Sequence, residues 1–516
     1  CSMALTDIPL MAGQGQGSFY FRGGNTLQMV AVTVTASAGG ITAASQNQDV
    51  IVGLPSKLAF TTAPKSLMAG ECSGAMTVQS QDVANNPSNV SGATTVTLAA
   101  APATGVTFYS DTACATPSTT VSIGAGSNTV SFSARGITGG TPMVSATASG
   151  LTAAMQSLDI APMVRTGTCS IAALATSVAC PISPALNADL TKTFFLFQAT
   201  SVVASIDDMA VRCVLTGAST LTCSRGGNGG TANIRWYTVS RPSGLTVQHF
   251  PSVVENNGGS ALTTQTIASV NQASTFVLLS TQTSAGAGQF SAGRWSSVRL
   301  ASATSVEIRR LSAPDTTLTH SLQVVEWSGA AVDRPASAVT MAHNNGSITD
   351  TVTSSADPAF LLHSWRYGQA STGREMCRLG VRGALTDPTT LTFTRAAGAG
   401  GACDDEALAI EYERVRLPGH RVDVTLVSMP ASSVDAAPVT LGAAVDLTRS
   451  VAFFGATDFA GQAMGETSDS TNDRFRDSLA RASFTNDTTV QVSRAEPATT
   501  GTSAAAWTLF VWQLVP

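Results

Sequence analysis

The most regular polar side chains in this chain of 516 residues are arginines that recur at matching points of four related segments. A guanidinium group forms two parallel hydrogen bonds with a carboxylate, so repeated arginines could form four equivalent sites for an acidic glycan. The alternative is structural, with each arginine covering apolar surface of a sheet or pairing with a neighbouring carboxylate. Because recurrence within internal repeats indicates a shared structural task, we favour surface arginines of that second kind. The two series are Arg225, Arg310, Arg395 and Arg494, and Arg212, Arg299, Arg382 and Arg481.

Side chains that could perform catalysis are present, but they follow no catalytic motif. The five histidines lie outside any HExxH or other metal-ligand spacing, and none recurs in register across the four segments. No GxSxG motif of a serine hydrolase occurs. Two carboxylate pairs could serve acid–base chemistry, although loops of β proteins commonly carry such pairs. We therefore expect no catalytic residue, and a protein that is not an enzyme. The residues considered are His249, His320, His343, His363 and His420, the pair Asp207 and Asp208, and the pair Asp404 and Asp405.

One acidic loop contains oxygen ligands of the kind that Ca²⁺ binds. The segment GETSDSTNDRFRD (465–477) includes Asp469, Asn472 and Asp473. The loop lacks the spacing of an EF-hand, so an ordinary solvated loop is the simpler interpretation. We expect no metal or other cofactor, with Ca²⁺ at this loop as a weak alternative.

Nine cysteines are present, and none forms a CxxC or CxxCH motif, which leaves metal knuckles and c-type haem attachment without support. In an all-β chain they are better explained as disulfides of an oxidising, extracellular setting. Cys213 and Cys223 flank one predicted hairpin and could face each other across it. Two further pairs fit the predicted modules, at the entry to the first and at the hairpin rim of the third. These pairs are Cys169–Cys180 and Cys377–Cys403.

The composition points to strands and turns. A hydrophobic fraction of 43% excludes wholesale disorder, whereas 45 glycines and abundant Thr, Ser, Ala and Val favour many short strands joined by turns. The net charge of −5 is spread along the chain, so nothing suggests a nucleic-acid surface. No apolar run of about 20 residues occurs, and no membrane-spanning segment is predicted.

The N-terminal third contains an internal repeat. The opening CSMALTDIPLMAGQGQGSFYFRG aligns with the later CATPSTTVSIGAGSNTVSFSARG, and ITAASQNQDV (41–50) aligns with LTAAMQSLDI (151–160). Alternating runs such as AMTVQSQD and TVSFSAR, separated by turn residues, favour a β-sandwich. Residues 1–53 are therefore predicted to be the second half of a domain whose complete copy spans 54–162.

This region resembles the bacterial Ig-like repeats of large surface and secreted proteins. The resemblance is carried by KLAFTTAP (57–64) and by the ECSG and YSDTAC segments (71–74 and 109–114). It covers residues 1–162 only, and it implies a sandwich fold and an extracellular setting rather than an activity. It also implies a disulfide Cys72–Cys114, which leaves Cys1, the equivalent of Cys114, unpaired here.

Cys1 itself has two explanations. The chain could be the end of something longer, in which case the partner of Cys1 lies upstream. A lipoprotein would instead begin at this cysteine with an acylated thiol. The repeat favours the first explanation, because the chain would then begin inside a domain.

Four modules of a second kind follow, and they resemble no family that we recognise. Each module has an opening strand such as TKTFFLFQAT, a strand–turn–strand segment that ends on the recurrent arginine, and a closing strand such as IRWYTV. We predict an all-β protein of tandem β-sandwich modules arranged as an elongated array. The predicted module ranges are 163–254, 255–337, 338–430 and 431–516.

This organisation suggests a structural or adhesive component of a bacterial extracellular fibre, filament or surface adhesin. Its expected partners are copies of itself or other fibre subunits, and surface glycans, and polymerisation through strand or edge exchange is a sharper form of the hypothesis. The alternative is a secreted carbohydrate-binding, lectin-like protein with Ig-like spacers. Trp236, Trp327 and Trp512 could then stack on sugars, although their strand positions favour the core.

Overall fold

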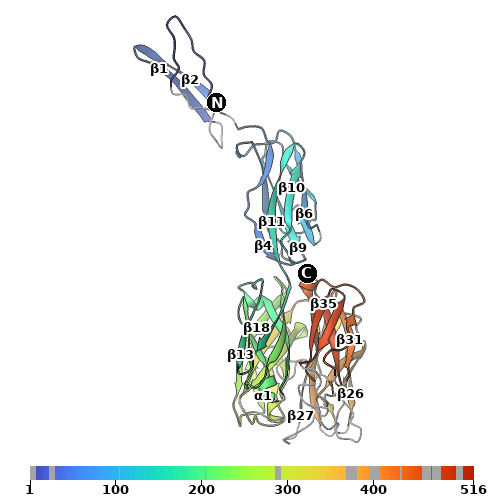
Figure 1. Cartoon of the computed structure of the whole chain (residues 1–516). Helices are drawn as coiled ribbons and strands as arrows, with labels where there is room; N and C mark the ends of the chain where they lie inside the picture. Colours follow the sequence, from blue (N-terminus) through green and yellow to red (C-terminus); the bar gives the residue numbers. More distant parts are fainter. Residues whose placement is uncertain are drawn as a thin grey trace. The chain divides into compact units, whose positions relative to one another are not determined.

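The computed structural model confirms the predicted all-β class, with strands joined by turns and a few short helices (Figure 1). None of the described helices has the length and hydrophobicity to cross a membrane. The structure describes residues 7–21, 30–50, 52–103, 105–203, 205–284, 292–343, 345–367, 380–395, 407–430, 433–455, 466–467, 478–495 and 504–515.

The chain forms two compact units, Cys1–Ile160 and Ala161–Pro516. In the first unit, β1 (Val30–Ala38) and β2 (Ile41–Val50) form an antiparallel hairpin. All of their described side chains are at least partly exposed.

This hairpin repeats the last hairpin of the same unit, formed by β10 (Met143–Ala148) and β11 (Leu151–Ala161). Both hairpins carry a bulge just before the turn. Both turns contain a glycine with positive φ, +80° at Gly40 and +77° at Gly150, a conformation that residues with a Cβ rarely adopt. The internal repeat that the sequence indicates is therefore present in this pair of hairpins.

The remainder of unit 1 is a sandwich with the strand order β7-β9-β5-β3-β11-β10-β6-β8, in which β4 also pairs with β11. Every second side chain of β5 is buried, because the alternating sequence MTVQSQ turns one face toward the core. The predicted disulfide Cys72–Cys114 is present. The strands are β3 (Lys57–Phe60), β4 (Lys65–Met68), β5 (Met76–Gln81), β6 (Thr94–Ala101), β7 (Val106–Tyr109), β8 (Thr120–Ile123) and β9 (Thr129–Gly136).

Unit 2 consists of four modules with one shared plan. In each module, strands one, six and three form an inner sheet, and strands two, five and four form an outer sheet. Strands four and five form a hairpin with the same bulge in all four modules. The four predicted repeats are therefore structurally equivalent, and residues can be compared by their register in these sheets.

Modules 1 and 2 contain six strands each. Those of module 1 are β12 (Val164–Ile171), β13 (Ser177–Pro181), β14 (Thr193–Ser201), β15 (Arg212–Gly217), β16 (Thr220–Ser224) and β17 (Ala232–Ser240). Those of module 2 are β18 (Leu245–Glu255), β19 (Leu262–Thr266), β20 (Thr275–Thr283), β21 (Ser297–Ser302), β22 (Ser305–Arg309) and β23 (Leu318–Trp327). The short helices are α1 (Ile206–Met209), η1 (Leu190–Lys192), η2 (Gln272–Ser274) and η3 (Ala292–Arg294).

Modules 3 and 4 follow the same plan with small additions. Module 3 contains β24 (Ala331–Asp333), β25 (Val339–Met341), β26 (Ser347–Thr351), β27 (Ala359–Tyr367), β28 (Arg382–Asp387), β29 (Thr390–Thr394) and β30 (Leu408–Arg416). Module 4 contains β31 (Arg421–Met429), β32 (Val439–Thr440), β33 (Ser450–Phe454), β34 (Glu466–Thr467), β35 (Arg481–Asn486), β36 (Thr489–Ser493) and β37 (Ala505–Gln513), with the short helix η5 (Leu447–Arg449) before β33.

The predicted module boundaries at 255, 338 and 431 are too late. Strands β18, β24 and β31 were assigned to the preceding module, but each pairs with the closing strand of the following one. The physical reason is that the partner strand lies about 60 to 90 residues downstream, so no local pattern indicates the pairing. The observed modules are 164–240, 245–327, 331–416 and 421–513.

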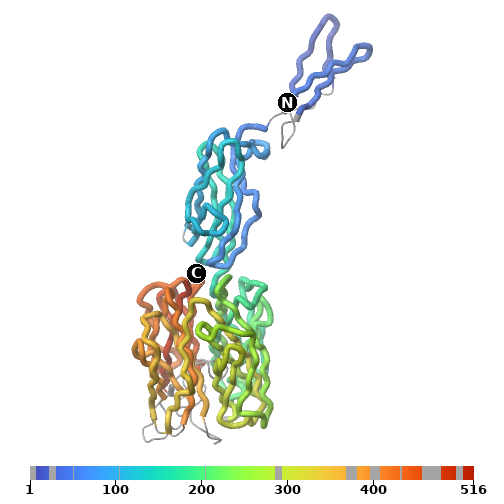
Figure 2. The backbone as a smooth tube through the Cα atoms, turned by 180° about the vertical axis from the view of Figure 1, so that it is seen from behind, coloured from blue at the N-terminus to red at the C-terminus, as the bar shows by residue number. Residues whose placement is uncertain are grey.

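The four modules form a closed ring, so the predicted elongated array is wrong for this part of the chain. Strand four of each module packs on the inner sheet of the next, and β35 of module 4 packs on β14 and β17 of module 1. Figures 1 and 2 show modules 1 and 2 beside modules 3 and 4 from opposite sides. Hydrogen bonds join each neighbouring pair: Phe195 N to Gln323 Oε1 (3.0 Å), Val277 N to Glu413 Oε2 (2.7 Å), His363 N to Gly455 O (2.9 Å) and Gln198 Nε2 to Ala452 O (2.8 Å).

Aromatic side chains from the four inner sheets meet where the modules converge. Phe194 packs edge-on to Phe276 at 5.7 Å between ring centroids, and Phe276 packs edge-on to Phe360 at 6.0 Å. Trp512 of module 4 contacts Phe194 and Phe360, at 6.3 and 5.3 Å. Since the inner sheets are covered on both faces, β14 and β20 are almost continuously buried and apolar rather than alternating.

Candidate functional site

The first arginine series is buried, which corrects the expectation that these arginines lie on the surface. Arg225, Arg310, Arg395 and Arg494 are 1–4% exposed. In each module the guanidinium group donates to main-chain carbonyls of the loop between strands one and two. Arg395 donates to Asn345 O (2.9 Å) and Ala342 O (3.2 Å), and Arg494 makes the matching bonds to Ser433 O (3.0 Å) and Pro430 O (2.9 Å). These side chains satisfy buried carbonyls and fix a loop, and are not accessible to a ligand.

The four arginines of the second series do not occupy one equivalent position, although the sequence predicts that they do. The register of the strand-four hairpins places Arg212, Arg382 and Arg481 at one position, opposite the last residue of strand five. In module 2 that position is Ser297, and Arg299 lies two residues further along. The members of this series are only partly buried. Arg212 contacts module 2 through Gln282 Oε1 (3.3 Å) and Pro251 O, so this series lies at the edges between modules.

Module 2 contains a buried polar cluster that the sequence did not indicate. His320 Nε2 lies 2.8 Å from Glu255 Oε2, and Thr281 Oγ1 lies 2.8 Å from His320 Nδ1. Arg310 forms an ion pair with the same Glu255 oxygen. Burial, followed by the charges of Arg310 and Arg212, lowers the pKa of His320 to about 3. The imidazole is therefore neutral, so its Nε2–H donates to Glu255 and the threonine hydroxyl donates to Nδ1.

This hydroxyl–imidazole–carboxylate series has the connectivity of a catalytic relay, but its setting is that of a core. Thr281 is 2% exposed, Glu255 4% and His320 0%, so a substrate has no access to the hydroxyl. The cluster orders the interior of module 2. The sequence alone does not reveal the cluster. Once the modules are aligned by register, His320 and Glu255 occupy the positions that Ile234 and Ile171 have in module 1.

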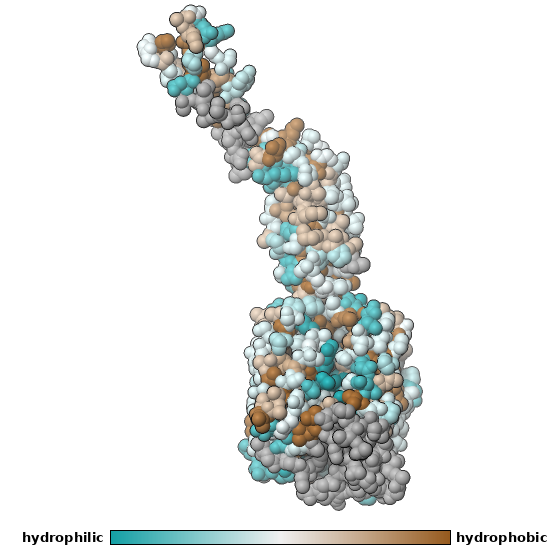
Figure 3. Space-filling view, in the orientation of Figure 1, coloured by the Kyte–Doolittle hydropathy of each residue, from teal (hydrophilic) through white to brown (hydrophobic). Residues whose placement is uncertain are grey.

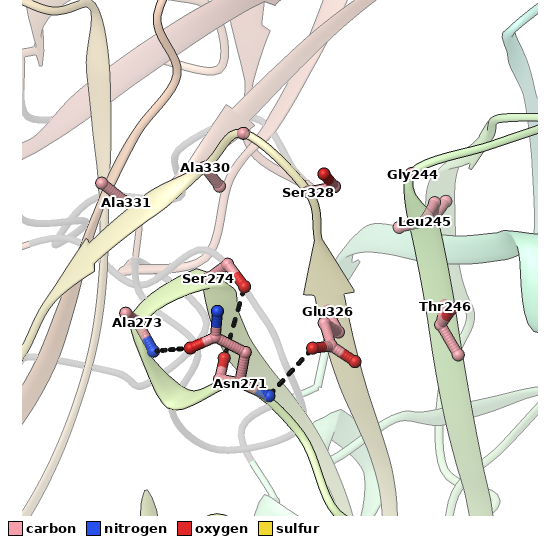
Figure 4. Close-up of a pocket in the computed structure, with 11 residues that line it drawn as sticks. Gly244, Leu245, Thr246, Asn271, Ala273, Ser274, Glu326, Ser328, Ala330 and Ala331 are labelled. Atoms are coloured by element: carbon pink, nitrogen blue, oxygen red, sulfur yellow. Dashed lines mark hydrogen bonds between the residues drawn. The ribbon is translucent and has the colours of Figure 1, made fainter.

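An open hollow lies at one end of module 2, with a volume of about 440 Å³ (Figure 4). It is lined by two turns of main chain and by Asn271, Ser274 and Glu326. Asn271 N donates to Glu326 Oε1 at 2.8 Å, and its side-chain oxygen accepts from Ala273 N at 3.1 Å. The hollow offers polar groups suited to hydroxyl-bearing ligands.

The remaining predicted residues have plain structural settings. The carboxylates of Asp207 and Asp208 are buried, and Asp208 accepts from Gly229 N at 2.6 Å. The three tryptophans considered as sugar platforms are at most 2% exposed. Disulfides Cys169–Cys180 and Cys213–Cys223 are present as predicted. Within the described ranges, no three histidine, cysteine, aspartate or glutamate residues are grouped to hold a metal ion. The predicted residues that fall outside those ranges are Cys1, Cys377, Cys403, Asp404, Asp405, Asp469, Asn472 and Asp473.

Three of the five histidines lie at contacts between modules. His249 Nε2 is 3.0 Å from Thr193 O, and His363 donates its main-chain N–H to Gly455 O. Burial lowers the pKa of all three, to about 4 for His363 and His420. Trp512 Nε1 donates to His420 Nδ1 at 3.1 Å, which fixes the neutral ring beside the aromatic centre.

Comparisons with known proteins do not assign this chain to a family. No family model matches the chain, and no curated protein matches it. Among solved structures, Escherichia coli alpha-2-macroglobulin activated by porcine elastase is similar over 80% of this chain and 49% of that chain, at 11% identity and a TM-score of 0.16. The chain thus spans about half the length of that structure, and a likeness at this TM-score carries no conclusion about function.

Proposed function

We propose that this chain is a non-enzymatic structural and adhesive component of a bacterial extracellular fibre, filament or surface adhesin. Two observations support the setting: three disulfides, which form in oxidising compartments, and an all-β, multi-module fold. Figure 3 shows polar and apolar residues interspersed on the visible face of the described residues. The expected partners are copies of the same chain, other fibre subunits or surface glycans.

The closed ring of modules carries this proposal. Each module is held by two neighbours through buried side chains that bond to main-chain atoms, such as Gln198 to Ala452 O and Ala482 N (2.8 and 2.5 Å) and Gln323 to Phe195 O (2.9 Å). Such contacts are satisfied only when neighbouring modules are packed together, so each module is stabilised by its neighbours. A body of this kind resists local opening, which suits a protein exposed outside the cell to force and proteases.

The alternative of a carbohydrate-binding protein keeps one supporting observation, the polar hollow at Asn271, Ser274 and Glu326. Its other basis is weakened, because all six tryptophans of the chain are buried and cannot stack on a sugar.

The experiment that tests the proposal is immunogold electron microscopy of the source cells with an antibody against unit 2, combined with non-reducing electrophoresis of the extracellular fraction. We expect label on fibres or at the cell surface and oxidised cysteines. Label confined to the cytoplasm, with free thiols, would contradict the proposal. A glycan array probed with the whole chain tests the alternative, for which strong selective binding to neutral glycans is the expected result.

A further inference from the structure

Three positions recur by register at the contacts between modules 1 and 2, 2 and 3, and 4 and 1. The first is the opening residue of strand four in one module. The other two belong to the inner sheet of the next module: the eighth residue of strand three, and the strand-six residue paired with the sixth. Between modules 2 and 3 these are Ser297, Arg366 and Glu411. Between modules 4 and 1 they are Arg481, Thr200 and Arg235.

The contact between modules 2 and 3 is electrically balanced and fully bonded. Arg366 Nη1 donates to Ser297 Oγ at 2.5 Å and to Glu411 Oε1 at 3.1 Å. One guanidinium, one carboxylate and one hydroxyl therefore satisfy each other in a buried setting. The contact between modules 1 and 2 carries a single charge, because Gln282 accepts from Arg212 and the third position is Ser321.

The contact between modules 4 and 1 has two guanidinium groups and no carboxylate at the same three positions. Within the described residues, neither Arg235 nor Arg481 forms an ion pair. Arg235 Nε, Arg481 Nε and Thr200 Oγ1 are buried atoms without a hydrogen-bond partner, and Thr200 as a whole is 0% exposed. The carboxylate of Asp435 forms no ion pair with either arginine; its Oδ1 accepts a hydrogen bond from Ser493 Oγ at 2.5 Å.

The two arginines are held close together by the fold. Gln198, the register partner of Arg235, accepts from Ala482 N at 2.5 Å, and Tyr237 donates to Ala482 O at 3.2 Å. These bonds fix the residue that follows Arg481 over the inner sheet of module 1. The guanidinium carbon of Arg235 lies 5.3 Å from the centroid of the Tyr237 ring. Burial and then the charge of Arg235 lower the pKa of Arg481.

We propose that the contact between modules 4 and 1 is a binding site for an oxyanion, held by the guanidinium groups of Arg235 and Arg481. Two guanidinium forks supply donors to a carboxylate, sulfate or phosphate group. Both arginines are partly exposed, so an anion can reach them from solvent. The oxyanion is either a free inorganic ion or the acid group of a glycan. This anion site does not depend on the proposed fibre function.

The repeat itself supplies the decisive variant. Arg235→Glu places at this position the carboxylate that module 3 has at Glu411, so the variant should contain its own counter-ion. We expect sulfate to raise the melting temperature of the full-length wild-type chain more than chloride does at equal ionic strength. We expect Arg235→Glu to melt higher than wild type without sulfate and to lose the sulfate-specific part of the response. The general stabilisation by sulfate, which acts on any protein surface, remains in both.

Milder variants keep the test independent of folding. Arg481→Gln should weaken binding of the anion by about tenfold, because a charge-assisted hydrogen bond is lost. Arg299→Gln removes the same charge from a surface arginine that donates to Ala336 O, and it should bind as wild type does. Isothermal titration calorimetry with inorganic sulfate and with trigalacturonate gives the affinities.

The outcomes separate the sources and can overturn the site. Much tighter binding of trigalacturonate than of sulfate identifies a glycan acid, whereas equal or tighter binding of sulfate identifies a free ion, and either supports the site. Failure of both probes to bind the wild-type chain overturns it. An unchanged sulfate response in Arg235→Glu and Arg481→Gln overturns it as well.

Discussion

Modules 1 and 2 have the same strands in the same order, yet matching positions in their interiors are filled by opposite chemistry. Module 1 has apolar residues at Ile171, Ala199 and Ile234 and is bridged by Cys169–Cys180 and Cys213–Cys223. The same three positions in module 2 hold Glu255, Thr281 and His320. The cysteine pair of the hairpin is replaced by Val298 and Ile308, which face each other in the same register. The fold therefore depends on strand order and the shared buried arginine, while the interior can be covalent and apolar or polar and ionic.

The first prediction transfers the interior of module 1 into module 2. Glu255→Ile alone should lower the free energy of unfolding by about 3–5 kcal/mol, because it leaves Arg310 without the carboxylate in a buried site. The triple variant Glu255→Ile, Thr281→Ala and His320→Ile should recover part of this loss. Arg310 would keep its bonds to Ser260 O and Ser296 Oγ, but it would lack a carboxylate such as Asp208, which lies 3.9 Å from Arg225 in module 1.

Chemical denaturation and hydrogen exchange of module 2 peptides measure both variants. A triple variant as unstable as Glu255→Ile would mean that the two interiors are not interchangeable and that the polar cluster is required for this module.

The second prediction concerns the covalent interior of module 1. Cys213→Val combined with Cys223→Ile copies the pair of module 2 and should lower the stability of module 1 by about 3 kcal/mol, mainly through the lost constraint on the unfolded chain. Cys213→Ala with Cys223→Ala should cost more, because it also removes buried side-chain volume. Hydrogen exchange of module 1 peptides gives the change, with Cys72–Cys114 as an untouched control. A Val/Ile variant as stable as wild type would show that the bridge adds nothing to the module.

The third prediction uses the histidines, which module 1 lacks and module 2 contains. The pKa of buried His320 is about 3 in the folded state, below the value of about 6.5 for an unfolded histidine. Below pH 6.5 the unfolded state therefore binds more protons, so stability is complete above that pH and falls as the pH decreases toward 3. The loss at pH 5 should be about 2 kcal/mol for this residue.

Hydrogen exchange at pH 7 and pH 5, corrected for intrinsic rates, should show loss of protection in module 2 before module 1. His320→Ile should flatten this dependence, and His343→Gln, which changes an exposed histidine, should not. Equal acid sensitivity in both modules would contradict the assignment to His320.

The sequence predicts the strands, the repeat and the disulfides Cys169–Cys180 and Cys213–Cys223 from local patterns, whereas Cys72–Cys114 is implied by the Ig-like resemblance. Cys213 and Cys223 are ten residues apart on one hairpin, and hairpin register alone brings them together. It does not predict ring closure, since the residues that join the modules, among them Gln198 and Glu413, belong to no recurrent pattern. The sequence alignment also places Arg299 in the wrong series. Its Val-Arg pair matches the Val-Arg pair at Arg212 by residue type, but the sheet register shows that Ser297 is the equivalent of Arg212.

The burial of Arg225 and its three equivalents agrees with the alternation of strand five, but the charge of an arginine argues against it in the sequence. Each arginine directly follows strand five and continues its buried face, as Arg225 follows Leu221 and Cys223. A loop from the start of the module covers it, and that loop is recruited by the pairing of strand one with strand six, which no neighbouring residue indicates.

The fourth prediction is that a solvent-exposed ion pair contributes little to the free energy of unfolding of module 2. Arg309 and Glu307 form an ion pair on the outer sheet of module 2, with nitrogen–oxygen distances of 2.6 and 2.8 Å, and their side chains are 34% and 19% exposed. Module 1 has Ser224 and Thr222 at these positions. Glu307→Thr with Arg309→Ser should change the free energy of unfolding by less than about 0.5 kcal/mol, because both charges remain solvated when the pair is broken. Chemical denaturation, as used for Glu255→Ile, measures this change and allows the exposed and the buried ion pair to be compared. A loss comparable to that of Glu255→Ile would mean that accessibility does not decide which of the ionic contacts of module 2 hold it together.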